Sequence, residues 1–419
     1  MSSVINAQYY TDSLFDCRNI LNHFNATEGP NDEPLWNGQK YQLVQCDVGL
    51  GGVCPDGTIQ TAGKICQWVR YLKLKCDKEP NAHTRIHVTT NSMPTHCYNA
   101  LGGGDSYPAG SADFNEIIKY QWTVDFNMYP LLMSSAEGTF NVNNFNHTIL
   151  NSQRALDNML CTEDSLDHLL IDENSRYTEK LIRKVDGVER EVSPWDDDTS
   201  VLGSVVKLPN SDMVAGIAVN GVFLFKGTHY YNIDGFFPKN WTGQLTLQYH
   251  QNDVCMGTSK QYNVYRYHMH SPCIYPGSPL AQKILPCLDE YAANCSSNPT
   301  DYVFKYTPME QYGIRPIGIA RDGRPIYGPY KQDGSLWQPC EVDICNGRYV
   351  MRNYYAYQLT MFFPYTIGCW GPGYAANSRI VSCSTNPRIC IQKLGSSAIQ
   401  QISANILIAV VLGVFATFY

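Results

Sequence analysis

The chain has 419 residues and a mass of 47.2 kDa, which allows one large domain or two to three ordinary ones. An apolar fraction of 44% is enough to build a core and excludes a wholly disordered chain. The net charge of −7 and the absence of a basic run argue against nucleic acid as a partner. Only 16% of residues are charged, while Tyr, Gly and Pro are abundant, which favours strands and turns over long helices.

The first 77 residues contain five cysteines and few periodic runs, so 1–77 is predicted to be a small cysteine-rich module. A main β domain is expected over 78–390, with an insertion at about 127–205. Within it, 86–93 and 117–126 alternate between apolar and polar residues as strands do. Some helix is expected in 150–193, and a helix at 280–293 after Pro279. The remaining residues, 391–419, read as a small-residue linker and an apolar tail.

Sixteen cysteines, an even number without any C-x-x-C pair, indicate disulfides rather than metal sites or free thiols. Such numbers are rare in reducing compartments, so we expect an extracellular or cell-surface protein. The cysteines expected in disulfides are Cys17, Cys46, Cys54, Cys66, Cys76, Cys97, Cys161, Cys255, Cys273, Cys287, Cys295, Cys340, Cys345, Cys369, Cys383 and Cys390.

Four N-x-S/T sequons agree with secretion and predict N-linked glycans on Asn25, Asn146, Asn240 and Asn294. A secretory leader has a positively charged start and an apolar stretch of about 7–15 residues. Residues 1–17 have neither. Either the leader is missing from this sequence, which we favour, or the secretion argument is wrong.

Two segments repeat in register 102 positions apart, GIAVNGVFLFKG at 216–227 and GIARDGRPIYGP at 318–329. The Asn-Gly and Asp-Gly pairs inside them are strong hairpin signals, because tight turns need positive φ. A second pair of segments also matches in spacing. His268 lies 13 residues after Cys255, and Gln358 lies 13 residues after Cys345. These matches predict an internal repeat, roughly 210–275 and 312–371, unless two Tyr- and Gly-rich β segments agree by coincidence.

The predicted fold is therefore mainly β. We expect a disulfide-rich sandwich, or two pseudo-symmetric β-sheets packed together, with a few short helices. Residues that match between the halves are expected to meet at their shared interface.

Several motifs of the repeat together resemble the YHYH-domain family. They are Asn220-Gly-Val, Asp253-Val-Cys-Met-Gly, Tyr265-Arg-Tyr-His, the Asp322-Gly hairpin with PIYGP, Cys345-Asn-Gly and Pro364-Tyr-Thr-Ile-Gly-Cys. The match covers about 215–371, with weaker likeness from about residue 80 onward, at 91–96. The family implies a domain type but no settled activity. Three of its expected histidines are replaced, by Thr258, Arg266 and Gln358.

His268 and His270 are the candidate metal ligands. As i and i+2 on a strand, they point to one face about 6–7 Å apart and could share Cu or Zn. The third ligand would come from His96, His250 or Asp322. The alternative is that both histidines form hydrogen bonds within a Tyr-rich core or lie at a subunit contact, and the three replaced histidines favour this alternative. Otherwise no cofactor is expected.

The C-terminal tail has no charge after Lys393, and 406–419 is almost wholly apolar. This run is shorter than the roughly 20 residues that span a bilayer. Small residues at 395–398 before it are typical of a GPI-attachment signal, with Ser396 as the anchored residue. Alternatively the tail pairs as a strand with a neighbouring subunit and builds a polymer, or packs as a buried terminal element.

The sequence thus favours a secreted, N-glycosylated, disulfide-rich cell-surface or matrix protein of structural or binding type, either GPI-anchored or self-assembling. No G-x-S-x-G, HExxH, Walker A or dinucleotide-binding motif points to an enzyme. The alternative is an extracellular Cu- or Zn-binding protein, or a metal-dependent enzyme, that uses His268 and His270.

Overall fold

The computed structural model describes residues 10–47, 54–55, 65–80, 83–99, 119–126, 181–185, 188–192, 205–207, 214–227, 234–236, 250–259, 264–339, 341–342, 345–351 and 354–368. Strands greatly outnumber helices in these ranges, which confirms the mainly-β prediction. The helices are α1 (Leu14–Leu21), α4 (Pro299–Tyr306) and the 3-10 helix η3 (Met309–Gln311).

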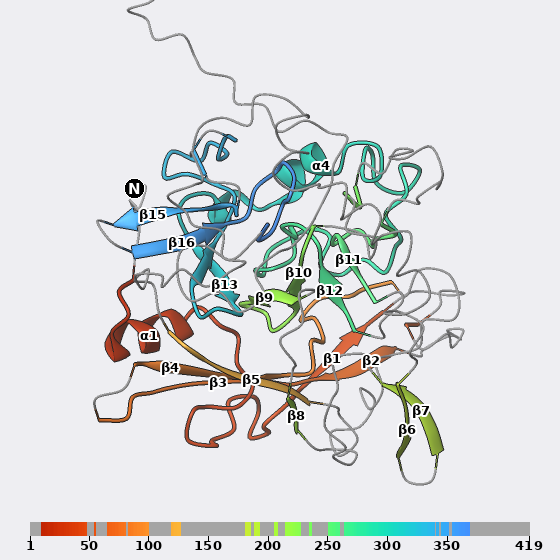
Figure 1. Ribbon diagram of the computed structural model, residues 1–419. Helices are drawn as coiled ribbons and strands as arrows, with labels where there is room; N and C mark the ends of the chain where they lie inside the picture. Colours follow the sequence, from red (N-terminus) through yellow and green to blue (C-terminus); the bar gives the residue numbers. More distant parts are fainter. Residues whose placement is uncertain are drawn as a thin grey trace, which may run out of the picture.

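The strands form four sheets (Figure 1). The two small sheets pair β1 (Gln42–Cys46) with β2 (Cys66–Arg70), and β6 (Leu181–Val185) with β7 (Val188–Val192). The four-stranded sheet runs in the order β3 (Leu72–Asp77), β4 (Arg85–Thr90), β5 (Lys119–Asp125) and β8 (Val205–Lys207). The eight-stranded sheet runs in the order β11 (Gly257–Thr258), β12 (Arg266–Tyr267), β10 (Phe223–Phe225), β9 (Val214–Ala218), β13 (Pro316–Ala320), β14 (Pro325–Tyr327), β16 (Tyr354–Gln358) and β15 (Gly347–Met351).

The alternating pattern of the four-stranded sheet separates an apolar from a polar face. In β3 the side chains of Leu72 and Leu74 are buried, while Lys75 between Leu74 and Cys76 is exposed. Successive strand residues point to opposite faces, so this alternation leaves the outer face polar. β4 and β5 lie within the two segments predicted as strands, 86–93 and 117–126, apart from Arg85 at the start of β4.

Both predicted hairpins are present, β9–β10 and β13–β14, but their turns differ from the two-residue turn expected. In the first, the Gly221 amide donates to the Ala218 carbonyl, and the Ala218 amide donates to the Val222 carbonyl. Only the glycine has positive φ, 89° at Gly221 and 87° at Gly323. This is the three-residue loop in which a left-handed glycine follows an ordinary turn.

The eight-stranded sheet is symmetric about the contact between β9 and β13. Those strands are antiparallel, and Ile217 lies opposite Ile319, its counterpart in the sequence repeat. On either side the order is hairpin partner, then a parallel neighbour, then an antiparallel edge strand. The two halves therefore join edge to edge in one sheet.

Matching glycines make the same close approaches in both halves. A Cβ on Gly216 would lie 2.4 Å from the Ile319 carbonyl oxygen, and a Cβ on Gly318 would lie 2.2 Å from that of Ile217. Only glycine permits such spacing between β9 and β13. The backbones of these two strands are thus in direct contact at the junction.

The apolar face of the four-stranded sheet packs on the β9–β10 hairpin. The ring centroid of Phe223 lies 5.5 Å from that of Tyr120 and 6.1 Å from that of Trp122. The Thr90 hydroxyl donates to the Gly221 carbonyl at 2.7 Å. One core therefore runs across both sheets.

Five disulfides lie among the described residues, and no cysteine there is free. The pairs are Cys17–Cys76, Cys46–Cys97, Cys54–Cys66, Cys255–Cys273 and Cys287–Cys295. Cys345 is also disulfide-bonded. The sequence predicts a boundary between a module at 1–77 and a domain that starts at 78. The Cys46–Cys97 disulfide and the pairing of β3 with β4 both connect residues on the two sides of this boundary. Cys161, Cys340, Cys369, Cys383 and Cys390 lie outside the described residues.

The helix predicted at 280–293 is wrong. The segment forms turns, because Pro286 cannot continue a helix and the Cys287 amide is bound to the Asn252 carbonyl. The helix α4 begins instead after Asn298, whose side chain caps it by accepting from the Asp301 amide. Of 150–193, where some helix was expected, the described residues form the hairpin β6–β7.

No helix within the described ranges is long and apolar enough to cross a bilayer. The C-terminal tail and Ser396 lie outside those ranges.

Candidate functional site

The Tyr-His residues that suggested chemistry form a closed hydrogen-bond network in the core. The Tyr267 hydroxyl lies 2.5 Å from His96 Nε2 and accepts from the Asn220 amide at 3.0 Å. His96 Nδ1 lies 2.8 Å from the Cys97 carbonyl oxygen. A carbonyl only accepts, so Nδ1 carries the proton and Nε2 accepts from Tyr267. Burial lowers the pKa of His96 to about 4, which keeps the ring neutral.

His268 uses both ring nitrogens in the same way. Nδ1 donates to the Lys226 carbonyl at 2.6 Å, and Nε2 accepts from Arg266 Nε at 3.1 Å. The ring also stacks on His250, with centroids 4.0 Å apart. His268 would have to break one of these hydrogen bonds before binding a metal ion.

His270 differs, because both of its ring nitrogens are buried and have no hydrogen-bond partner within the described ranges. Its ring packs edge-on against Tyr330 at 6.2 Å, whereas His268 contacts Phe225 and His250. Burial lowers the pKa of His270 to about 3. Within the described ranges, no group of three potential ligands contains His268 or His270.

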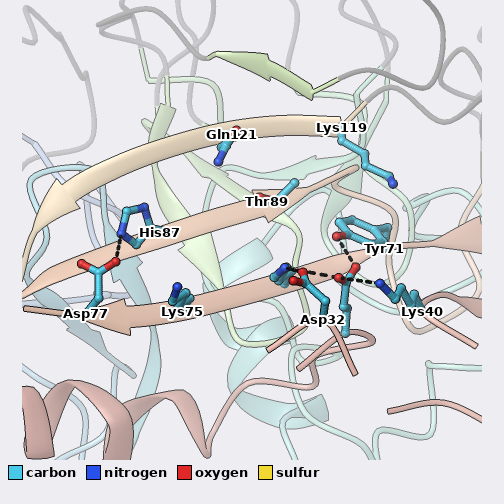
Figure 2. A pocket seen from close by; sticks show the side chains of 11 residues that line it. Asp32, Lys40, Tyr71, Lys75, Asp77, His87, Thr89, Lys119 and Gln121 are labelled. Carbon is cyan, nitrogen blue, oxygen red and sulfur yellow. Dashed lines mark hydrogen bonds and ion pairs between the residues drawn. The ribbon is translucent and has the colours of Figure 1, made fainter. Parts of the chain in front are cut away.

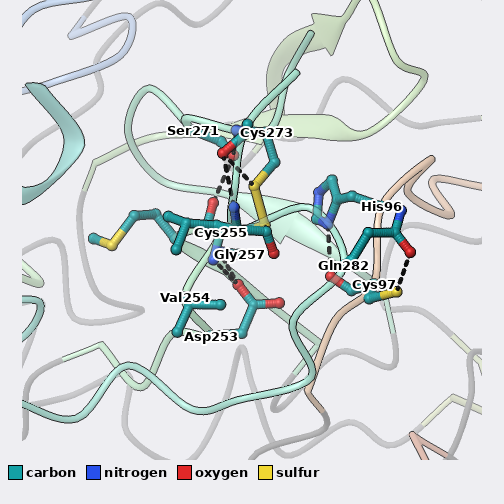
Figure 3. Close-up of a disulfide and its surroundings, with 12 residues drawn as sticks. His96, Cys97, Asp253, Val254, Cys255, Gly257, Ser271, Cys273 and Gln282 are labelled. Atoms are coloured by element: carbon teal, nitrogen blue, oxygen red, sulfur yellow. Dashed lines mark hydrogen bonds between the residues drawn. A yellow bond between two sulfur atoms is a disulfide. The ribbon is translucent and has the colours of Figure 1, made fainter. Parts of the chain in front are cut away.

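One set of potential metal ligands does converge, His96 with Cys255 and Cys273. The two sulfurs are joined to each other in a disulfide, so neither is a thiolate ligand (Figure 3). The loop before this disulfide is fixed by Asp253, whose carboxylate accepts from the amides of Cys255 and Gly257. The cluster is therefore a structural staple.

The second half repeats the network with different polar groups. The Tyr357 hydroxyl, which matches that of Tyr267, donates to Asp322 Oδ2 at 2.6 Å. The same carboxylate forms a 2.5 Å ion pair with Arg324, and its other oxygen accepts from the Arg324 amide. Asp322 is thus a turn residue held by its own hairpin. In each half a tyrosine from the neighbouring strand anchors the hairpin turn.

A polar pocket of about 550 Å³ lies on the outer face of the four-stranded sheet (Figure 2). Its floor comes from β3, β4 and β5, and the segment after Glu28 contributes its wall. The residues that line it are Glu28, Asp32, Lys40, Tyr71, Lys73, Lys75, Asp77, His87, Thr89, Lys119 and Gln121. The sequence analysis did not single out these residues. The signal available was the run of polar side chains on alternate positions of three strands.

Ion pairs neutralise one end of this polar pocket. Glu28 is 3.4 Å from the ammonium of Lys40 and 3.2 Å from that of Lys73, and it accepts from the Tyr71 hydroxyl at 2.5 Å. Lys73 also pairs with Asp32. Burial opposes the charge of Lys73, but these pairs outweigh burial and raise its pKa. The hydrogen bond from Lys73 lowers the pKa of Asp32.

At the other end of the pocket, His87 Nε2 lies 2.8 Å from Asp77 Oδ2. Between the two ends, Lys75, Thr89 and Gln121 belong to three neighbouring strands. Thr89 lies opposite Gln121. Lys75 lies opposite His87, and His87 is two residues before Thr89 on the same face of β4. No side-chain hydrogen bond or ion pair engages these three groups among the described residues.

Two of the four predicted glycosylation sites lie in the described residues, and both asparagines are exposed, Asn25 and Asn294. Asn25 lies at a second cavity of about 670 Å³ between α1 and β3. Asn146 and Asn240 lie outside the described residues.

Comparisons with protein-family models, with curated proteins and with solved structures found no match for this chain. The resemblance to the YHYH-domain family therefore stays a prediction.

Proposed function

We propose that this protein is a secreted, N-glycosylated binding or structural protein of the cell surface or extracellular matrix. The observation that carries the proposal is the state of the cysteines, since every described one is disulfide-bonded. Disulfide content of this kind is that of a secreted or extracellular protein. The exposed sequon asparagines, Asn25 and Asn294, agree with passage through a compartment that attaches glycans.

A noncatalytic role is supported by the Tyr-His network. A general base or metal ligand needs an available ring nitrogen. His96 and His268 have none, because each donates from Nδ1 and accepts at Nε2. Both ring nitrogens of His270 lack a partner among the described residues, but this ring is buried and belongs to no group of three potential ligands there. The polar pocket on the four-stranded sheet is the surface that this proposal offers to a ligand. Attachment would come from the C-terminal tail, as a GPI anchor on Ser396 or as a polymer contact.

The proposal is tested by intact mass of the purified protein, with and without reduction and glycosidase treatment. We expect reduction alone to add about two mass units for each disulfide, and glycosidase to remove mass at the sequons. Abundant free thiols in denatured, unreduced protein would refute the extracellular assignment. Release of the protein from membranes by phospholipase would show a GPI anchor. Loss of polymers on deletion of 394–419 would show self-assembly instead.

A further inference from the structure

We propose that the polar pocket binds a sugar that carries a single negative charge, such as a uronic acid or a singly sulfated saccharide. The inference rests on the binding role proposed above and names its ligand class.

The centre of the pocket offers donors that no other described residue engages. Lys75 presents an exposed ammonium, with Thr89 and Gln121 on the adjoining strands. A lysine is a point charge with three donors, and the hydroxyl and the amide both donate and accept. One anionic group beside several hydroxyls matches this set. An apolar ligand would leave all three groups unpaired and is disfavoured.

The charges around the pocket limit how acidic the ligand can be. Of its acids, Glu28 and Asp32 are paired with Lys40 and Lys73, and Asp77 with His87. The Lys119 ammonium lies 4.2 Å from the centre of the Tyr71 ring, at the same end as Glu28. With His87 counted as neutral, the four lysines of the pocket exceed its three carboxylates by one positive charge. That excess matches one anionic group, whereas a dense polyanion would meet the carboxylates at both ends.

The size and position of the pocket agree with a short saccharide. A volume of about 550 Å³ is within the range of small-molecule sites. The floor is a hydrogen-bonded sheet, so Lys75, Thr89 and Gln121 are already held in register before any ligand arrives. Figure 2 shows these side chains projecting from neighbouring strands.

Calorimetric titration with three matched disaccharides tests the inference. The probes are N-acetyllactosamine, its 6-sulfated form, and the disaccharide in which glucuronic acid replaces galactose. We expect at least one charged probe to bind at least tenfold more tightly than the neutral one, and added salt to weaken it. The charged probe that binds identifies the anionic group. Equal affinity for all three probes, or no binding of any, overturns the inference.

Variants then locate the site. Lys75→Gln is expected to weaken the charged probe at least tenfold and leave the neutral probe unchanged. Gln121→Ala is expected to weaken both, and Lys283→Gln, at an exposed lysine outside the pocket, to change neither. Unchanged binding in folded Lys75→Gln and Gln121→Ala refutes this site. Thiol titration of the same samples separates this failure from failure of the secreted assignment, which would show free sulfhydryls.

Discussion

Arg70 is a fully buried cation that joins the N-terminal segment to the eight-stranded sheet. Its guanidinium donates to the Asn220 carbonyl at 2.9 Å, to Gln42 Oε1 at 3.1 Å and to the Asn25 carbonyl. Burial lowers the pKa of Arg70 to about 9, so the group stays charged at neutral pH. One side chain thus satisfies acceptors from three segments that are far apart in the sequence.

We expect Arg70→Met to lower the free energy of unfolding by about 3 kcal/mol, because it leaves buried carbonyls unpaired. Urea denaturation measures the change. The matched control is Arg85→Met, which removes a half-exposed arginine of β4 from pairs with Glu79 and Asp125 and should cost less than about 1 kcal/mol. Similar losses in both variants would contradict the role given to Arg70.

Single residues show where sequence reasoning succeeds and fails. The interpretation of His268 as a core residue agrees with its contacts, and Asp322 bonds its own turn as turn aspartates do. The pocket around Lys75 was missed, because lysines at alternate strand positions look like any solvated face. Only the pairing of β3 with β4 and β5 brings Lys75, Thr89 and Gln121 together.

At the scale of elements, the junction of β9 and β13 depends on two glycines. We expect Gly216→Ala and Gly318→Ala each to destabilise the protein by about 1–3 kcal/mol, since each Cβ would overlap a carbonyl oxygen of the other strand. The control is Gly328→Ala, whose Cβ would meet its nearest atom at 3.4 Å. Thermal unfolding of the three variants measures this. A loss for only one junction glycine would contradict the equivalence of the two halves.

Disulfides at this scale differ in the length of chain that they close. Cys17–Cys76 ties α1 to β3 across a sequence separation of 59, whereas Cys287–Cys295 spans 8. The entropy of the unfolded chain predicts that replacing both cysteines by alanine costs about 4 kcal/mol for the first pair and about 2–3 kcal/mol for the second. Guanidinium denaturation of the two double variants gives the comparison. A larger loss of stability on removal of Cys287–Cys295 than of Cys17–Cys76 would show that the entropy of the unfolded chain does not determine how much each disulfide stabilises the protein.

Elements with strong local signals could be predicted from the sequence, and elements that depend on distant partners could not. The hairpins at Asn220-Gly221 and Asp322-Gly323 are present because their turn residues act locally. The segment 280–293 has helical spacing, yet it pairs with 252–254 through backbone hydrogen bonds and is closed by Cys287–Cys295. Tertiary partners override periodicity there.

For the whole molecule, buried histidines make stability depend on pH. His96 and His270 have their pKa lowered by burial to about 4 and about 3, from 6.5. Below pH 6.5 these two histidines bind protons in the unfolded chain but stay neutral in the folded protein, so the free energy of unfolding decreases as the pH falls. Asp253 opposes this, because burial raises its pKa to about 7 and the folded form keeps a proton. The two histidines together outweigh this one carboxyl.

We therefore expect the melting temperature to fall between pH 7 and pH 4.5, as scanning calorimetry would measure. His96→Gln should make this dependence shallower, and His83→Gln, at an exposed position, should leave it unchanged. A melting temperature that is constant over this range would contradict the prediction that the two histidines outweigh Asp253.

The arrangement of the halves was only partly predictable at this scale. Matching segments at 216–227 and 318–329 indicate equivalent structures, and Ile217 meets Ile319 as expected of matching residues. Whether such halves stack face to face or join at an edge depends on the backbone approach at Gly216 and Gly318. No periodicity in the sequence reports that approach.

The edge-to-edge junction also has a consequence for synthesis on the ribosome. Gly216 emerges 102 positions before Gly318, its counterpart across the seam. At typical translation speeds, synthesis of the intervening residues takes roughly 5–20 s, and during this time β13 is not yet present to pair with the edge of β9. A nascent chain with an uncovered strand can recruit the wrong partner, including a neighbouring nascent chain. Slowing translation between the two halves should therefore lower the yield of native protein.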